Sequence, residues 1–210
     1  MQPFTSDEID IVERAISRRR SMGISRLQKD KPVDRALLEQ LFEAANWAPS
    51  HGETEPWRFT VYTDESRRAL GEAFAAAYKA VTPQGEFKDA AYQAQKERAF
   101  NSPVWIAIGT SPKLGTDGSL VNDEHEEMIA TGCAIQNLHI MASAFGLAGM
   151  WQSNAIFTSD SVAQFVGLKP PAKLLGFFIL GWPNIDWPEG ERAPAMEKVR
   201  WADDAAASPA

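Results

Sequence analysis

The stretch NDEHEEMIATGCAIQNLHIMASAF, residues 122–145, is the longest helical pattern in the chain. Acidic residues fill its first turn, where they complement the positive end of the helix dipole. Its second half is apolar on nearly all sides, and Gly146 follows as a residue type that commonly ends helices. A helix that is apolar on most faces belongs at the centre of a fold or of an interface. We therefore predict one central helix over about 122–145.

Shorter patterns surround this helix on both sides. Apolar residues at helical spacing predict further helices over 6–18, 34–48, 65–80 and 88–100. In the first of these, Ile9, Val12 and Ile16 recur after Ser6, which we expect to cap the helix. Apolar runs bounded by Pro or Gly predict strands over 57–62, 103–110, 147–153 and 173–182. The predicted fold class is α+β, a single domain over 1–210 with a mixed β-sheet sandwiched by helices and a disordered tail at 203–210.

Composition and charge exclude several classes of function. A chain of 210 residues with a net charge of −7 suits one sizeable core and offers no strongly basic face to nucleic acid. No apolar run approaches the ~20 residues that span a bilayer, so we expect no membrane association. Cys133 is the only cysteine, and residues 1–10 lack an apolar leader, which favours a cytoplasmic location.

The common catalytic motifs are missing from the sequence. There is no GxSxG elbow, no HExxH pair and no Gly-rich phosphate loop between a strand and a helix. The acidic run DEHEE at 123–127 contains His125, but a solvated helix start explains it better than a metal site. His139 lies in the apolar half of the central helix and is interpreted as a core or interface histidine. We therefore predict no catalytic side chain and no metal ligand.

Arginines and one hydroxyl group suggest an anion site. The run SRRRS at 17–21 places Arg18, Arg19 and Arg20 at a helix end, directly before Ser21. Arginine forks match phosphate oxygens, and a hydroxyl can complete the cage. The alternative is that these cations only complement the helix dipole. Far downstream, Arg192 stands in an otherwise acidic segment as a second candidate fork.

Two further segments carry aromatic and polar side chains together. Trp151, Gln152 and Ser153 follow one another at the end of the strand predicted over 147–153, where they could meet the edge of a flat ligand. Trp151 could equally be core filling. The connection NWAPSHGETEPWRF, residues 46–59, places Trp47 and His51 in a polar segment bracketed by prolines.

Five motifs together carry a resemblance to a known family. They are SRRRSMGISRL, AANWAPSHGETEPWRFTVY, ATGCAIQNLHIMASAFGLAGMWQS, LLGFFILGWP and RAPAMEKVRW. In this order and spacing they resemble the nitroreductase family of FMN-dependent, NAD(P)H-oxidising flavoproteins, most closely its short YdjA-like branch. The resemblance covers roughly residues 10 to 201.

The resemblance implies a role for each candidate residue. It implies that the FMN phosphate and ribityl chain are bound by Arg19, Arg20, Ser21 and Arg192. It implies that the isoalloxazine ring lies along Trp151, Gln152 and Ser153. It also implies that the FMN held by the other subunit is reached by Trp47 and His51. The chain also departs from its relatives. Glu53 and Glu55 stand where the family prefers amides, and Trp47 and Gln152 stand where the branch commonly has arginine. The loss of two cations bears on phosphate affinity and on the flavin potential, because positive charge stabilises reduced flavin.

The implied protein is a homodimer with flavin sites at the subunit interface. The helix over 122–145 would form the dimer core, with Ala134 and Ile135 within it. NAD(P)H would reduce the flavin, and the flavin would reduce an electron-poor acceptor, a nitroaromatic or quinone, by a ping-pong mechanism. One alternative is a flavin-binding protein that stores, senses or consumes FMN without nicotinamide turnover. Another is a dimeric interaction protein without flavin.

Overall fold

A four-stranded sheet lies at the centre of the protein. In the computed structural model, residues 2–202 are described, so the tail predicted at 203–210 lies outside the described residues. The strands are β1 (Trp57–Tyr62), β2 (Val104–Thr110), β3 (Ala148–Gln152) and β4 (Lys173–Gly181), in the order β1-β2-β4-β3. All four strands were predicted from the sequence, with ends that differ by at most a residue or two.

Every pair of neighbouring strands runs antiparallel, so the predicted mixed sheet is wrong. Two helices, α3 (Ser66–Val81) and α4 (Asp89–Arg98), separate β1 from β2 and pack against each other. The helix pair returns the chain to the end of the sheet where β1 finished. Tyr62 at the end of β1 therefore pairs with Trp105 near the start of β2, and the two strands run antiparallel. Between described residues, a parallel pairing occurs at the isolated bridge from Ser21 to Gly149.

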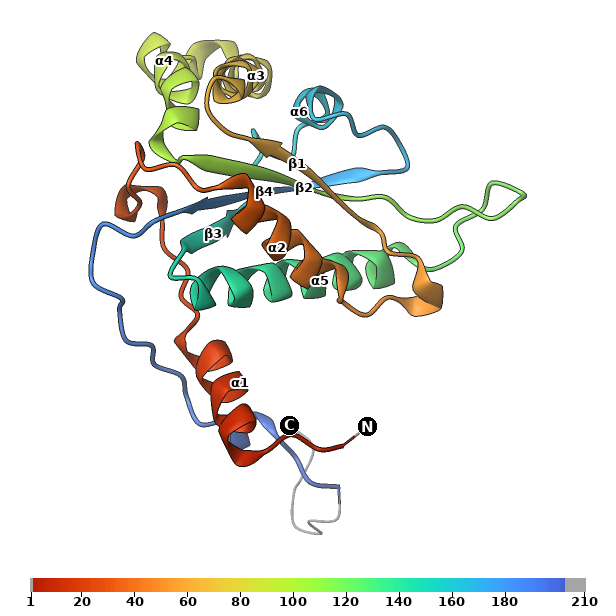
Figure 1. Ribbon diagram of the computed structural model, residues 1–210. Helices are drawn as coiled ribbons and strands as arrows, with labels where there is room; N and C mark the ends of the chain where they lie inside the picture. The colour runs from red at the N-terminus through yellow and green to blue at the C-terminus, as the bar shows by residue number, and fades with distance from the viewer. Residues whose placement is uncertain (1, 203–210) are drawn as a thin grey trace.

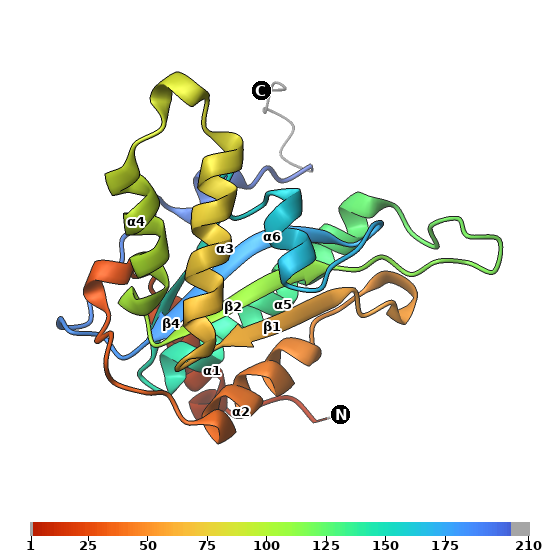
Figure 2. The same cartoon turned by 90° about the horizontal axis from the view of Figure 1, so that it is seen from above.

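Helices cover both faces of the sheet (Figures 1 and 2). One face packs against α2 (Arg35–Asn46) and α5 (Glu124–Ala144), and the other against α3 and α6 (Asp160–Phe165), with α4 packed on α3. The sequence did not predict α6, whose six residues are too few for a helical period. Short 3₁₀ turns occur at Ile24–Arg26, His51–Glu53, Gln84–Glu86, Ala99–Asn101 and Ala195–Lys198. No helix among residues 2–202 is long and apolar enough to cross a membrane.

The predicted central helix is confirmed as α5. Its most buried side packs into the core of its own chain. Ala134, Ile135 and Leu138 are buried against the sheet and α2. The expected place of Ala134 and Ile135 in a dimer interface is therefore wrong, because neither is accessible in one chain. The outer face of α5 instead presents Ile129, which is 64% exposed, and Gly132, where an added Cβ would meet open space.

Helix α1 (Ser6–Arg18) extends away from the body of the protein (Figure 1). The capping residue is Thr5 and not the expected Ser6, and Thr5 forms a reciprocal capping box with Glu8. None of its residues is buried, although Ile9 and Ile16 fall on one side at helical spacing. The helix thus carries an apolar stripe, Ile9 and Ile16, that residues 2–202 leave exposed.

After β4 the chain returns along the end of α1. We call residues 183–192 the strap. Pro183 forms a bridge with Leu27, and the indole of Trp187 donates to the carbonyl of Arg18 at 2.7 Å. Figure 1 shows this dark blue segment running from β4 towards α1. The strap therefore brings the second arginine segment of the sequence close to the first.

Candidate cofactor site

The arginine-rich segment lies beside the outer edge of the sheet. Arg19 leaves the helical conformation, with φ −57° and ψ 128°, so the next residues are extended. Ser21 then pairs with Gly149, and the amide of Met22 donates to the carbonyl of Gly149 at 3.0 Å. Because β3 is an edge strand, its free side accepts this short addition. The arginines are thereby fixed beside the first half of β3.

Arg19 is oriented by a buried histidine from α5. Its Nη1 lies 3.4 Å from Nδ1 of His139 and 3.5 Å from the hydroxyl of Ser21. The other ring nitrogen of His139, Nε2, lies 2.9 Å from the carbonyl of Arg20. This pattern assigns the proton to Nε2, which donates to that carbonyl, and leaves Nδ1 to accept from Arg19.

The electrostatics of this cluster favour an anion. Burial and then the charge of Arg19 lower the pKa of His139 to about 4, so the imidazole is neutral near pH 7. Burial, followed by the charges of Arg192 and Arg20, lowers the pKa of Arg19, which still remains a cation. Within the described part of the chain, no carboxylate lies within ion-pair distance of these three arginines. No ion pair among residues 2–202 therefore compensates their positive charge.

Arg20 has a second, structural role. Its guanidinium donates to the carbonyls of Ser17 at 2.6 Å, Arg19 at 2.8 Å and Pro188 at 3.1 Å. It therefore closes the end of α1 and holds the strap. A Cβ at Gly190 would overlap the guanidinium, so glycine lets the strap pass this close. The interpretation that the arginines satisfy the end of the helix is therefore right for Arg20. Among the described residues, Arg19 makes no such bond to the helix carbonyls, and its guanidinium can still bind an anion.

The end of β3 presents a partly exposed surface. Trp151 is 40% exposed and donates to the carbonyl of Leu175 at 3.1 Å, so it is not simple core filling. Gly176, with φ 124°, lies directly beneath, where a Cβ would collide with the carbonyl of Gln152. Gln152 is half-buried and Ser153 is exposed. This end of β3 lies just beyond Gly149, where the arginine segment pairs with the strand. It can present backbone groups and the Gln152 amide to a flat ligand.

Trp47 and His51 lie away from the arginine cluster of their own chain. Trp47 ends α2, is 81% exposed and donates to Glu43 at 3.2 Å. His51 Nδ1 lies 2.7 Å from Glu126 near the start of α5, whereas His139, beside Arg19, lies near its end. Glu126 and His139 are thirteen positions apart on the helix, which is about 20 Å at 1.5 Å per residue. One chain therefore holds two halves of the predicted site far apart.

The connection that carries His51 is anchored to the start of α5. Thr54 donates to the buried carboxylate of Glu127 at 2.8 Å, and the amide of Asn122 donates to the carbonyl of His51 at 2.6 Å. Glu53 and Glu55 adopt φ values of 52° and 45°, a region that asparagine tolerates better than longer side chains do. The shape of the connection is thus fixed by hydrogen bonds, which hold Trp47 and His51 at the surface.

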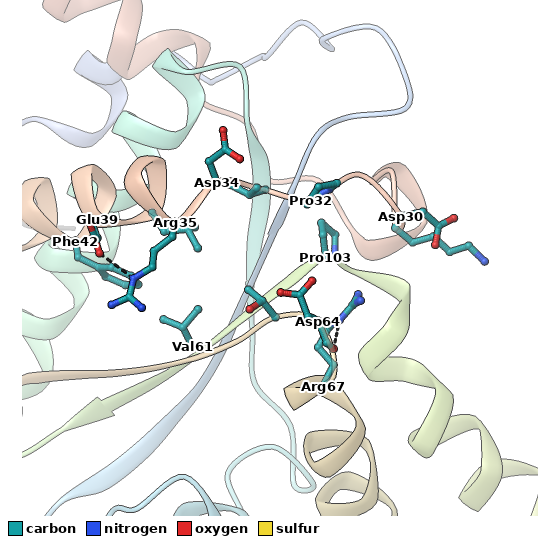
Figure 3. A pocket seen from close by; sticks show the side chains of 14 residues that line it. Asp30, Pro32, Asp34, Arg35, Glu39, Phe42, Val61, Asp64, Arg67 and Pro103 are labelled. Carbon is teal, nitrogen blue, oxygen red and sulfur yellow. Dashed lines mark hydrogen bonds and ion pairs between the residues drawn. The ribbon is translucent and has the colours of Figure 1, made fainter.

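A separate cavity of about 640 Å³ lies at the free edge of β1, between α2 and α3 (Figure 3). Arg35 pairs with Glu39 at 2.9 Å on one side, and Arg67 donates to the carbonyl of Asp64 at 3.1 Å on the other. None of the site residues predicted from the sequence lines it. Among the described residues there is also no group of three or more His, Cys, Asp or Glu side chains suited to a metal.

The structure brings together some of the predicted residues and adds two that the sequence did not suggest. Arg19, Arg20 and Ser21 lie beside the strand that carries Trp151, Gln152 and Ser153, and the positive charge of Arg192 is near enough to lower the pKa of Arg19. The sequence missed the contact of His139 with Arg19 and that of Arg98 with Gln152. An isolated histidine in an apolar helix gives no signal of such a partner. The cluster suits an anionic group joined to a flat ring.

Comparison with known proteins agrees with this geometry. The model of the nitroreductase family matches residues 16–182. YdjA of Escherichia coli, whose name assigns it provisionally to the NAD(P)H nitroreductases, is 29% identical, over 84% of this chain and 90% of YdjA. The nitrobenzene nitroreductase of Ectopseudomonas oleovorans is 39% identical, over 77% of this chain and 83% of that protein.

Solved structures show the same fold. A nitroreductase-like family protein from Bacillus cereus superposes with a TM-score of 0.76 at 25% identity, over 97% of this chain and 99% of that one. NfnB from Mycobacterium smegmatis, an FMN-dependent nitroreductase solved with NADPH, superposes with a TM-score of 0.69 at 22% identity, over 93% of this chain and all of that one. The matched region spans the arginine segment, the central helix and all four strands, and so the chain belongs to the nitroreductase family.

Proposed function

We propose that the protein is an FMN-dependent oxidoreductase that takes electrons from NAD(P)H. The observation that carries this proposal is the uncompensated pair of Arg19 and Arg192 with the hydroxyl of Ser21, placed beside the edge strand β3. Cations without protein counter-ions match a phosphate. Family membership, and the FMN and NADPH named in related structures, point to FMN as the molecule that carries this phosphate.

Each part of the cluster has a task in holding the cofactor. Arg19 and Arg192 would bind the phosphate, with Ser21 completing the cage, while Arg20 holds the strap over the same end. Trp151, Gln152 and Ser153 would lie along the ring. The bound flavin supplies the redox chemistry: it accepts a hydride from reduced nicotinamide and later passes the electrons on. The side chains bind and orient, and none has to act as an acid or base.

We infer that the site is completed by a second copy of the chain. The contact that holds His51 lies about 20 Å along α5 from the contact that holds Arg19, so we infer that these two side chains do not share one ligand within a single chain. The described part of the chain leaves both the apolar stripe of α1 and the surface at Gly132 on α5 uncovered. A homodimer would cover these surfaces and bring His51 of the partner subunit to the flavin.

The proposed acceptor is an electron-poor aromatic compound, a nitroaromatic or a quinone. The name of the nitrobenzene nitroreductase relative supports a nitroaromatic. The nicotinamide would leave before the acceptor binds if both used the same face of the flavin ring. Parallel lines in double-reciprocal plots at several acceptor concentrations would support this ping-pong order, whereas intersecting lines would contradict it.

The test is an absorbance spectrum of the purified protein, followed by anaerobic titration with NADH and NADPH. We expect about one FMN per chain after soaking with FMN and desalting, and bleaching of the flavin bands by one or both nucleotides. A protein without flavin bands would refute the proposal. A yellow protein that neither nucleotide bleaches would support a flavin-binding protein without nicotinamide turnover.

A further inference from the structure

Arg98 at the end of α4 is a half-buried cation without a counter-ion. Its Nη2 donates to Oε1 of Gln152 at 3.0 Å, and its guanidinium stacks over the ring of Phe157 at 5.0 Å. Its Nε is buried without a hydrogen-bond partner, and burial lowers the pKa of Arg98. No carboxylate among residues 2–202 forms an ion pair with it. Placing a charge there costs folding free energy, which calls for a functional reason.

The contact fixes the orientation of the Gln152 amide. An amide side chain has one acceptor oxygen and one NH₂ group that donates. Because Arg98 can only donate, it holds the oxygen of Gln152 toward α4. The NH₂ group is then the end left for a ligand, and it has no protein partner in the described residues. Gln152 is the last residue of β3, directly after Trp151, so this donor lies on the ring-facing strand of the site.

We propose that Arg98 is a positioning residue for the flavin, holding the Gln152 amide as a donor to the ring and placing a positive charge behind it. This inference rests on the proposed function. When a reduced nicotinamide passes a hydride to FMN, the nicotinamide becomes a cation and the flavin ring gains negative charge. A donor in front and a cation behind both favour the charged, reduced ring over the neutral, oxidised one. The branch commonly has arginine where Gln152 stands in this chain. Arg98 of α4 would supply that positive charge from behind Gln152.

The proposal is tested with Arg98→Met, which removes the charge but keeps an apolar chain over Phe157. The control is Lys79→Gln on α3, an exposed lysine whose loss changes the net charge equally. The measurements are the dissociation constants of oxidised and reduced FMN, the midpoint potential of bound FMN, and the unfolding temperature. We expect Arg98→Met to weaken the binding of reduced FMN about tenfold more than that of oxidised FMN. For a two-electron couple this lowers the potential by about 30 mV.

Two further variants separate positioning from a structural role. Arg98→Lys should restore part of the potential, because it keeps the charge. Gln152→Leu breaks the same contact from the exposed end and should lower the potential even if Arg98→Met does not fold. In the Gln152→Leu background, the added effect of Arg98→Met should be smaller than in the parent.

The outcomes of this test are distinct. A flavin-loaded Arg98→Met protein with the parental potential would overturn the inference and leave the proposed function standing. If Arg98→Met did not fold, an unchanged potential in Gln152→Leu would overturn it equally. If the parent protein took up no FMN, the proposed function would fail and this inference with it.

Discussion

Arg19 Nη1 lies 3.4 Å from Nδ1 of the buried His139, so an imidazole holds the arginine where a carboxylate would be the usual partner. A carboxylate would orient the guanidinium but also neutralise its charge. The neutral imidazole orients it and leaves the charge for a ligand. Because α5 is anchored in the core, the direction of Arg19 is fixed by the most buried helix of the fold. The protonation state of His139 therefore affects both the free energy of unfolding and the charge available at the site.

The first prediction concerns pH. The pKa of His139 is lowered to about 4 in the folded protein, from an ordinary value of about 6.5 in the unfolded chain. Between these values the unfolded chain binds more protons, so the free energy of unfolding falls as pH falls through this window. The full stability is present above about pH 6.5, and the loss amounts to about 3 kcal/mol once the pH has fallen to 4. Urea denaturation at several pH values measures it.

A matched variant isolates this histidine from the carboxylates that also titrate below pH 5. His139→Gln retains a donor for the carbonyl of Arg20 and an acceptor for Arg19 but has no titratable group. The variant should show a shallower loss of stability between pH 6.5 and pH 5, where few carboxylates contribute. Identical pH dependence in both proteins would contradict the assignment of a buried, neutral His139.

The second prediction concerns the phosphate. Arg19→Ala should weaken FMN binding by about 1.5–3 kcal/mol, the scale of hydrogen bonds to charged groups. This corresponds to roughly 10- to 150-fold in the dissociation constant. Arg18→Ala is the matched control, because Arg18 is exposed, adjacent and equally charged. Fluorescence titration measures both variants. Equal affinity in Arg19→Ala and the parent would exclude Arg19 from the phosphate site.

Much of the fold was predictable because its elements are long enough to show a period. The four strands and α5 follow directly from apolar runs bounded by Gly or Pro. The direction of β2 was not predictable, since it depends on α3 and α4 packing as a pair that returns the chain. The burial of Ala134 was also missed, because an all-round apolar helix does not reveal which side meets its own sheet.

The site was predictable only where neighbouring residues act together. The arginine run and the Trp151–Ser153 run are local patterns, and the structure places both beside Gly149. The partner of Gln152 is 54 positions away and that of Arg19 is 120 positions away. Such contacts arise from the packing of whole helices, so no local pattern indicates them. Arg98 in particular looks like an ordinary helix-end cation in the sequence.

The third prediction concerns association through α1. Ile16→Asp places a charge on the apolar stripe, where burial against a second chain would leave it unpaired at a cost of several kcal/mol. Ile11→Asp is the matched control: the two isoleucines are 53% and 56% exposed in the single chain, but Ile11 lies on the far side of the helix at about 100° per residue. Ile16→Asp should shift the protein to monomers with less bound flavin. Ile11→Asp should not.

Analytical ultracentrifugation over a hundredfold range of concentration measures this difference, with flavin absorbance followed in the same cell. The unfolding temperature of the monomeric Ile16→Asp protein shows whether the core remains folded. If Ile16→Asp and the parent associated equally, the stripe of α1 would not belong to the interface. If both variants dissociated equally, a general effect of charge on α1 would replace the stripe as the explanation.

The fourth prediction concerns the sharing of one site between two chains. His51→Ala and Arg19→Ala each remove one half of the proposed site, and the two halves lie about 20 Å apart along α5. In a homodimer with shared sites, each homodimeric variant should bind and reduce FMN poorly at both sites. After subunit exchange, a heterodimer gathers both lesions in one site and leaves the other intact. About half of the parental activity per heterodimer should therefore return.

Mixing the two variants under conditions that exchange subunits, with differently tagged chains to isolate the heterodimer, measures this recovery. Glu126→Gln serves as a control for the anchor of His51, because it removes the carboxylate that lies 2.7 Å from Nδ1 but retains the imidazole. If each site were built within one chain, every site in the heterodimer would carry one lesion and mixing would restore nothing. No recovery in an isolated heterodimer of two inactive parents would therefore exclude a shared site. Recovery would place His51 beside the flavin held by Arg19 of the partner subunit.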